Sequence, residues 1–295
     1  MRPFVLLLAL ASFTSPSPAQ DTAAFYFAAH EDDWQLFMNP NAYHDVQKPS
    51  CKVVFVYLTA GDDGAGLGNA GRSQPYYLAR ENGAKLSVKF MADAQKTPVI
   101  PLDSVASVSG HAIKRWLYRN TVSYFFRLPD GGVNGAGYTN TGWQSLKRLH
   151  EGALPAMTAI DGSATYAGWA DLTGTLRHLI DIERGAATNV WLNLPDPDLE
   201  KNIGDHPDHQ HMARGVLEAT ADLRWLNKAF YLDYVTAKLN ENMSTPDREI
   251  EAGTFAALVV GLTALDHPSS WEPMHRSWLS RHYVRIEPGI STGPR

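Results

Sequence analysis

The sequence predicts an α/β fold: a Rossmann-like, mostly parallel sheet with helices on both faces. Two strongly apolar runs, Phe25–Phe27 and Val53–Leu58, are typical of buried parallel strands. A helical pattern over residues 74–93 follows the second run, with Leu78, Leu86 and Phe90 as its expected core face. Ligands of open α/β sheets bind at the carboxyl ends of the strands, so we expect the site at that edge.

Residues 1–19 read as a secretory signal peptide. Arg2 gives a basic start, Phe4–Ala11 is an apolar core too short to span a bilayer, and Ser17–Ala19 offers small residues for cleavage. An uncleaved anchor is the alternative. We expect residues 20–295 to form a single domain with a C-terminal elaboration, secreted or periplasmic. No later segment is long and apolar enough to predict stable membrane insertion after signal removal.

Composition narrows the classes of partner. A net charge of −5 with scattered basic residues argues against a nucleic-acid partner, because phosphate binding needs concentrated Lys and Arg. The single cysteine, Cys51, excludes an internal disulfide, so stability must come from packing. Because Cys51 directly precedes an apolar strand, we expect it to be inert.

The first strand ends in a candidate metal motif, FYFAAHEDDW. His30 supplies an imidazole, and Asp32 and Asp33 supply carboxylates, a combination that suits zinc better than calcium or magnesium. Three consecutive acids repel one another in a cleft unless a cation or protonation neutralises them. The alternative interpretation is a solvated acidic turn.

A glycine-rich loop, Gly61–Gly71, follows the second strand. Within it, GLGNAG over Gly66–Gly71 matches the dinucleotide fingerprint. A true fingerprint turns directly from the first strand into a helix, whereas several residues separate Leu58 from Gly66. We therefore expect a mobile rim over the site.

The middle of the chain continues the α/β pattern. Strands are predicted at Val105–His111, Thr121–Phe126 and Asn189–Leu194, and helices at Trp143–Glu151 and Asp171–Arg184, with Ala153–Trp169 as a surface connection. The LPDGGVNGAG stretch is a loop in which Asp130 either binds sugar hydroxyls or fixes a turn.

A second candidate motif, DHPDHQH, lies at Asp205–His211. Pro207 fits the first helical position, with Asp205 or His206 as N-cap, so His206 and His209 lie one turn apart at the start of a helix that reaches Leu223. Such a helix start can aim two imidazoles at one target. Capping histidines on the surface are the alternative.

The C-terminal part predicts a strand at Ala229–Val235 and a helix that begins at Pro246, with Thr245 as N-cap, and runs to Leu265. The tail contains His267, His275 and His282 together with Trp271 and Trp278. No spacing among them supports a metal role, so we assign them to packing or surface.

Together, AHEDD and the distant HPDH resemble the PIG-L/LmbE-type zinc-dependent de-N-acetylases, whose pattern is AHPDD with a later HxDH. The resemblance covers roughly Ala24–Val216. Weaker support comes from YLTAGDDG at Tyr57–Gly64, from Arg80 and Glu81 on the next helix, and from LPDGG at Leu128–Gly132. Glu31 replaces the usual proline, and Trp34 replaces the usual acid after the aspartate pair. Neither change removes an expected metal ligand.

The resemblance implies a site and an activity. His30, Asp33 and His209 would bind one Zn²⁺, or another divalent metal, with one position left for water. Asp32 would be the general base, a protonated His206 would stabilise the oxyanion, and Arg80 and Asp130 would contact the sugar. The residues alone do not separate Asp32 from Asp33, or His206 from His209.

The expected reaction is removal of an N-acetyl group from a saccharide or glycoconjugate, such as an N-acetylglucosamine derivative. A carbohydrate-binding protein with a vestigial site and a dinucleotide-binding oxidoreductase that uses Gly66 and Gly68 are the alternatives. A serine hydrolase is disfavoured because the sequence contains no GxSxG elbow.

Overall fold

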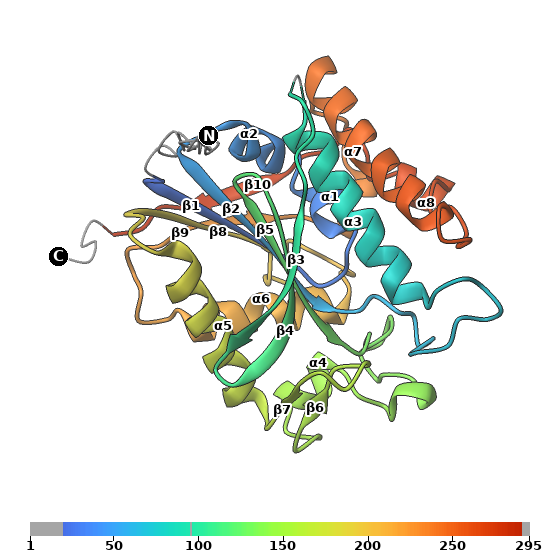
Figure 1. Cartoon of the computed structure of the whole chain (residues 1–295). Coiled ribbons are helices and arrows are strands. Elements are labelled where there is room, and N and C mark those ends of the chain that lie inside the picture. The colour runs from blue at the N-terminus through green and yellow to red at the C-terminus, as the bar shows by residue number, and fades with distance from the viewer. Residues whose placement is uncertain (1–19, 95, 291–295) are drawn as a thin grey trace, which may run out of the picture.

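The computed structural model describes residues 20–94 and 96–290, so the predicted signal peptide lies outside the described residues. An eight-stranded sheet in the order β10-β9-β8-β1-β2-β5-β4-β3 forms its centre (Figure 1). Strands β9, β8, β1, β2 and β5 are parallel to one another, and β10, β4 and β3 pair antiparallel. The strands span Thr22–Ala28 (β1), Cys51–Thr59 (β2), Leu102–Val108 (β3), His111–Tyr118 (β4), Thr121–Leu128 (β5), Asn189–Pro195 (β8), Asn227–Tyr231 (β9) and Val284–Glu287 (β10).

Helices cover both faces of this sheet, which confirms the predicted fold class (Figure 1). One face carries α4 (Leu146–His150), α5 (Trp169–Arg184) and α6 (Pro207–Ala219). The other carries α1 (Asp33–Phe37), α2 (Asn41–Gln47), α3 (Tyr76–Ala92) and α7 (Thr245–Thr263), with the short α8 (Pro273–Arg276) packed beside α7. No described helix is both long and apolar enough to cross a membrane.

Strand β1 lies at the centre of the fold and is buried on both sides. Phe25 and Phe27 point into the core under α4, α5 and α6, whereas Tyr26 points into the core under α1, α2, α3 and α7. Successive side chains of a strand alternate between faces, so a central strand needs apolar residues at every position. That requirement explains the unbroken apolar run that ends at His30.

The region around β3 and β4 differs from the prediction. Val105–His111 is not one strand, because a hairpin turn at Ser109 and Gly110 divides it between β3 and β4. Both residues have positive φ, at 51° and 86°, as a two-residue hairpin of type I′ requires. The antiparallel β3–β4 pair therefore extends a parallel sheet at its edge.

Helix α3 occupies its predicted position but turns a different face to the core. Phe90 is 43% exposed, whereas Gly83 and Ala84 are buried. A Cβ at Gly83 would lie 2.7 Å from the backbone oxygen of Leu258 on α7, so these small residues allow two helices to pack closely. Close helix packing has replaced burial of the larger side chains.

Three smaller predictions were also wrong. Ala153–Trp169 is not only a surface connection, because it forms the hairpin of β6 (Met157–Thr158) and β7 (Thr165–Tyr166), whose Met157 and Tyr166 side chains are buried. Helix α7 has Ser244 rather than Thr245 as its N-cap, since the Ser244 Oγ accepts the Asp247 N–H at 3.4 Å. Helix α6 ends at Ala219, short of Leu223.

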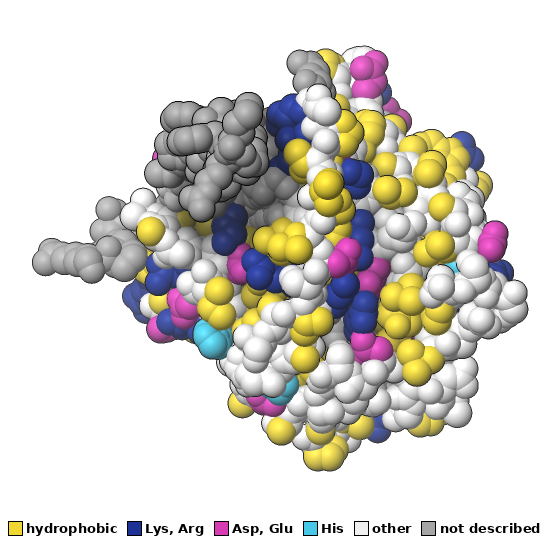
Figure 2. Space-filling model, in the orientation of Figure 1, with side chains coloured by type: hydrophobic (Ala, Val, Ile, Leu, Met, Phe, Trp, Pro, Cys, Tyr) yellow, Lys and Arg dark blue, Asp and Glu magenta, His cyan; other side chains and the backbone are white. Residues whose placement is uncertain are grey.

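The edge strand β3 leaves apolar side chains in solvent, with Leu102 60% and Val105 66% exposed. Figure 2 shows hydrophobic side chains interspersed with basic and acidic ones on this face. Lys114 on β4 and Asp103 on β3 form an ion pair, with Nζ and Oδ1 2.7 Å apart. Charged side chains along an edge strand oppose unwanted pairing with other chains.

Candidate metal centre

Polar residues follow the carboxyl ends of the parallel strands and meet at one edge of the sheet. β1 leads to His30 and Asp33, β2 to Asp62, β5 to Asp130, and β9 to Asp233. The loop after β8 leads to the start of α6, which carries the second histidine motif. All the named side chains are buried, as expected for a site at the carboxyl edge of an α/β sheet.

Three side chains at this edge form a compact triangle of donor atoms. His30 Nδ1 lies 3.2 Å from His209 Nε2, His209 Nε2 lies 3.1 Å from Asp33 Oδ1, and His30 Nδ1 lies 3.5 Å from Asp33 Oδ1. Ligand bonds of about 2.0–2.1 Å in tetrahedral geometry put ligand atoms roughly 3.3 Å apart. The triangle therefore has the size that a divalent metal such as zinc requires, and the donor set fits it.

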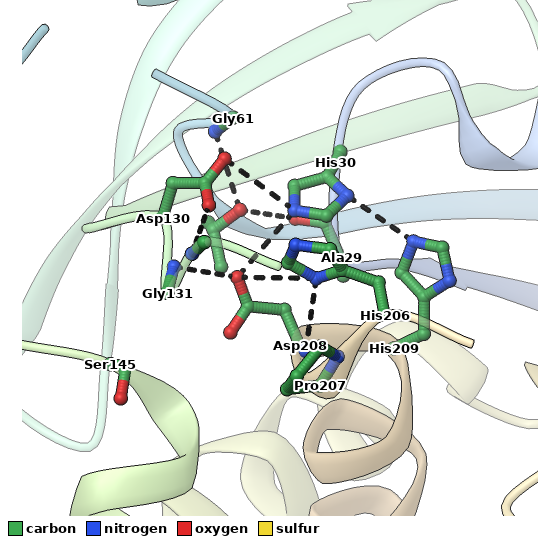
Figure 3. Close-up of polar contacts among 12 residues, drawn as sticks. Ala29, His30, Gly61, Asp130, Gly131, Ser145, His206, Pro207, Asp208 and His209 are labelled. Atoms are coloured by element: carbon green, nitrogen blue, oxygen red, sulfur yellow. Dashed lines mark hydrogen bonds and ion pairs between the residues drawn. The ribbon is translucent and has the colours of Figure 1, made fainter. Parts of the chain in front are cut away.

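Local structure explains how two of these ligands are aimed. The His30 backbone N–H donates to Asp33 Oδ2 at 2.8 Å, which folds the chain after β1 into a turn and leaves Asp33 Oδ1 for the triangle. Helix α6 starts at Pro207, and the His206 side chain caps it by accepting the Asp208 N–H at Nδ1, 3.2 Å away. His209 then lies in the first turn and faces His30 (Figure 3).

The outward nitrogen of each histidine faces carboxylates. His209 Nδ1 lies 2.8 Å from Asp205 Oδ1 and 3.2 Å from Asp233 Oδ2. His30 Nε2 lies 3.5 Å from Asp208 Oδ2 and 3.7 Å from Asp130 Oδ2 (Figure 3). Metal-binding histidines commonly donate their other N–H to a carboxylate, which fixes the tautomer and orients the ring. The surroundings of the triangle thus match those of a metal centre.

The carboxylates make this edge favourable for positive charge. Burial opposes protonation of His30, but Asp33 and Asp208 outweigh it and raise the pKa of His30 well above its usual value. Burial likewise opposes protonation of His209, whose pKa Asp205 and Asp33 nevertheless raise well above the usual value. A divalent cation would supply the same charge in place of these protons.

Asp32, the predicted general base, lies beside the triangle and outside it. Its Oδ1 forms an ion pair with Arg80 Nη2. Asp32 and His206 are 7% and 6% exposed, whereas Asp33 and His209 are 3% and 0% exposed. The residues expected to act on a substrate therefore keep slightly more solvent contact than two of the three expected ligands.

His206 differs from the sequence-based expectation of a protonated imidazole. Burial, followed by the neighbouring His30, lowers the pKa of His206 to about 3. Because Nδ1 accepts the Asp208 N–H, the neutral ring carries its proton on Nε2. The structure thus favours a neutral His206 that donates through Nε2.

The two predicted sugar contacts, Arg80 and Asp130, are both engaged within the protein. Arg80 Nε donates to Glu31 Oε2 at 3.0 Å, in addition to its ion pair with Asp32. Asp130 Oδ1 accepts the Gly132 N–H at 2.7 Å, while its Oδ2 faces His30. Arg80 lines a pocket, whereas Asp130 is close to the candidate metal ligands.

The two departures from the deacetylase pattern have structural roles. Burial raises the pKa of Glu31 to about 8 even though Arg80 faces it. Trp34 is fully buried, packs on Phe55 with ring centroids 4.6 Å apart, and donates from Nε1 to the Tyr57 hydroxyl at 2.7 Å. Neither residue displaces a member of the triangle.

The glycine-rich loop lacks the geometry of a dinucleotide fingerprint. Residues 60–75 separate β2 from α3, and the loop follows the second strand of the sheet instead of the first. The buried Asp62 fixes its start, since Oδ2 accepts the Gly66 N–H at 2.8 Å and Oδ1 accepts the Asp130 N–H at 3.0 Å. The loop lines a pocket beside Arg80.

Sequence patterns did not identify several residues at this edge. Asp208 lies inside the HPDH motif, so its proximity to the metal triangle could have been predicted. The only indication for Asp233 is its position after β9. His275, assigned to packing or surface, has Nε2 3.8 Å from Asp32 Oδ2. Cys51 behaves as expected, because it is buried and burial raises the pKa of its thiol to about 12.

No family model matches the sequence, and no curated protein matches it. Among solved structures, N,N'-diacetylchitobiose deacetylase from Pyrococcus horikoshii aligns with a TM-score of 0.48 and 15% identity over 91% of this chain and 84% of that one. The hydratase GalB, which acts on 4-carboxy-2-hydroxymuconate in Pseudomonas putida, aligns with a TM-score of 0.44 and 10% identity over 87% and 82%.

A third solved structure is a deacetylase of the teicoplanin biosynthesis pathway in complex with teicoplanin. It aligns with a TM-score of 0.43 and 13% identity over 83% of this chain and 88% of that one.

Proposed function

We propose that this chain is a zinc-dependent hydrolase that removes N-acetyl groups from amino sugars or sugar conjugates. The main support is the triangle of His30, Asp33 and His209, whose donor atoms lie 3.1–3.5 Å apart. Two imidazoles and one carboxylate form a ligand set of the kind found in catalytic zinc sites, which keep one position open. The AHEDD and HPDH resemblance adds the expectation of de-N-acetylation.

The residues around the triangle supply the remaining chemistry. A zinc ion bound there would polarise an amide carbonyl and lower the pKa of a bound water to about 7. Asp32 takes a proton from the attacking water as the new carbon–oxygen bond forms. The neutral His206 donates from Nε2 to the carbonyl oxygen as negative charge develops on it. When the carbon–nitrogen bond breaks, Asp32 returns the proton to the amine nitrogen. The acetic acid formed loses its hydroxyl proton to water and leaves as acetate.

Arg80 supports Asp32 in this role. Its guanidinium occupies Oδ1 of Asp32 and leaves Oδ2 for proton transfer. Burial raises the pKa of Glu31, which weakens its competition with Asp32 for the charge of Arg80. Arg80 and Asp130 remain our proposed contacts to the sugar, and a secreted or periplasmic location remains our proposal for the mature chain.

The test is acetate release from a panel of N-acetylated mono- and oligosaccharides by purified chain. We expect release from at least one of them, loss of release after chelation, and recovery with added zinc. Saccharide binding without release would instead support a carbohydrate-binding protein with a vestigial site. Release that persists after complete metal removal would contradict the proposed mechanism.

A further inference from the structure

We propose that His275, from the C-terminal α8, is a positioning residue for Asp32 and forms part of the substrate-facing wall of the site. This inference rests on the proposed function, because it assigns His275 to the reaction that Asp32 carries out. His275 Nε2 lies 3.8 Å from Asp32 Oδ2, the oxygen that Arg80 does not occupy. Two cationic or hydrogen-bonding side chains therefore flank one carboxylate from two directions.

A separation of 3.8 Å exceeds a normal hydrogen bond, which spans about 2.7–3.2 Å. Catalytic contacts in ligand-free structures are often long and shorten in the substrate complex. The two groups are close enough that a small rotation of the Asp32 side chain would bring them into contact. In the substrate complex, that contact would fix the direction in which Asp32 presents Oδ2.

The imidazole of His275 is firmly held. It stacks on Phe255 of α7 with ring centroids 5.8 Å apart and an interplanar angle of 16°, and Trp278 packs edge-on at 5.4 Å. Glu272 Oε1 lies 3.0 Å from Nδ1, although without the alignment of a hydrogen bond. The His275 side chain is 15% exposed. A ring held by aromatic packing on two sides can orient its neighbour.

A pocket of about 410 Å³ opens beside these residues. Arg80 and His275, the two side chains that flank Asp32, both line it. Its other walls come from the glycine-rich loop at 62–72 and from the C-terminal segment 267–272. The volume lies within the usual range for small-molecule sites. The lining combines carboxylates, guanidinium groups and hydroxyls with apolar surface, a mixture that suits the hydroxyls and ring faces of a saccharide.

The C-terminal segment is anchored to the chain that follows the glycine-rich loop. His267 Nε2 lies 2.9 Å from the backbone oxygen of Gln74, and the Ser73 Oγ donates to the backbone oxygen of Leu265 at 3.3 Å. These contacts join the end of α7 to the chain just before α3. The position of His275 is therefore linked, through the end of α7, to the glycine-rich loop that lines the same pocket.

The test compares His275→Phe, which keeps the aromatic packing, with His275→Gln, which restores a hydrogen-bond donor. We expect His275→Phe to lower kcat roughly 10- to 100-fold with zinc content and Tm unchanged, and His275→Gln to recover part of the loss. The matched control is His282→Phe, since His282 is also a tail histidine packed on an aromatic ring, Tyr231, away from the site. It should retain wild-type activity.

A double-mutant cycle separates positioning from simple packing. In an Asp32→Asn background, His275→Phe should have almost no further effect on the residual rate, because both changes act through the same carboxylate. Wild-type kcat in His275→Phe, or an equal fold-loss in both backgrounds, would overturn the inference while leaving the deacetylase proposal intact.

A measurement that needs no turnover tests the contact between His275 and Asp32 even if the chain is not a deacetylase. In zinc-loaded, ¹⁵N-labelled protein, Asp32→Asn should shift the ring-nitrogen resonances of His275, assigned by their loss in His275→Phe. Asp103→Asn, a change at the exposed edge strand, should not shift them. Unshifted His275 resonances in Asp32→Asn would overturn the inference even if the wild-type chain released no acetate.

Discussion

His30 and His209 are 179 residues apart in the chain, yet Nδ1 of one lies 3.2 Å from Nε2 of the other. The sheet brings them together, because His30 follows β1 and His209 lies at the start of the helix reached from the neighbouring parallel strand β8. Two buried imidazoles this close need a shared proton or a cation between them. The fold therefore creates a position where the proposed metal ion would lie between the two rings.

Removal of the proposed base should separate metal binding from catalysis. Asp32→Asn keeps the size of the side chain and leaves the triangle intact, so we expect normal zinc content with kcat lowered about 10²- to 10⁴-fold. Zinc analysis and acetate release on the same preparation measure both quantities. Asp103→Asn is the control, and full activity in Asp32→Asn would show that another group accepts the proton.

The carboxylates behind His209 should set metal affinity. Asp205 Oδ1 lies 2.8 Å from His209 Nδ1, so we expect Asp205→Asn to weaken zinc binding roughly 10- to 100-fold. Competition with a fluorescent chelator measures this change. Asp198→Asn, which changes a half-buried carboxylate in the loop before α6, serves as the control. Equal affinities in the two variants would mean that Asp205 does not support the ligand.

The strand-end glycine Gly131 should be intolerant of a side chain. Its N–H donates to Asp208 Oδ2 at 2.8 Å, and an added Cβ would lie 2.6 Å from Asp208 Oδ1 (Figure 3). Displacement of Asp208 disturbs the carboxylate that faces His30, so Gly131→Ala should lower zinc affinity about 10-fold or more.

Gly174 in α5 provides the matched control for that substitution. Nothing lies within 4 Å of a Cβ built there, so Gly174→Ala should raise stability by about 0.5–1 kcal/mol and leave zinc affinity unchanged. Urea unfolding measures the change in stability. A Gly131→Ala chain that binds zinc as tightly as Gly174→Ala would contradict the proposed role of Asp208.

The sequence was most informative where chemistry and local structure coincide. His30, Asp33 and His209 follow a buried strand or start a helix, and both positions carry clear local signals. Asp233 and His275 carry none, because their approach to the site depends on how β9 and α8 pack in three dimensions. The hairpin at Ser109 was missed because β-propensity continued across it, although the Ser-Gly pair is itself a turn signal.

The face of α3 shows a second limit of sequence patterns. A helix with apolar residues on several sides does not reveal which side its neighbours will cover. Close contact with α7 at Gly83 determines which face of α3 is buried, and large side chains such as Phe90 are partly exposed. Likewise, the charge of His206 depends on burial and on His30, which the HPDH motif alone does not reveal.

Stability should depend on pH through Glu251, a fully buried acid on α7. Burial raises its pKa from 4.5 to about 8, so the folded state holds a proton that the unfolded state releases. Its contribution to stability is complete below pH 4.5 and falls as pH rises toward 8, by at most about 1.4 kcal/mol per pH unit.

Glu251→Gln should remove this dependence. The difference in unfolding free energy between variant and wild type should therefore grow in favour of the variant from pH 5 to pH 8. Urea unfolding across that range measures the difference. Glu249→Gln, at an exposed position of the same helix, is the control, and a pH-independent difference for Glu251→Gln would show that the acid does not titrate on unfolding.

The proposed metal centre is tested most directly by zinc stoichiometry. Apo protein should be reloaded with zinc, dialysed and analysed for bound metal, in parallel with His209→Ala and with His178→Ala, which removes an exposed histidine on α5. We predict one zinc per chain in wild type and His178→Ala and almost none in His209→Ala. Equal zinc content in all three proteins would contradict joint binding by His30, Asp33 and His209.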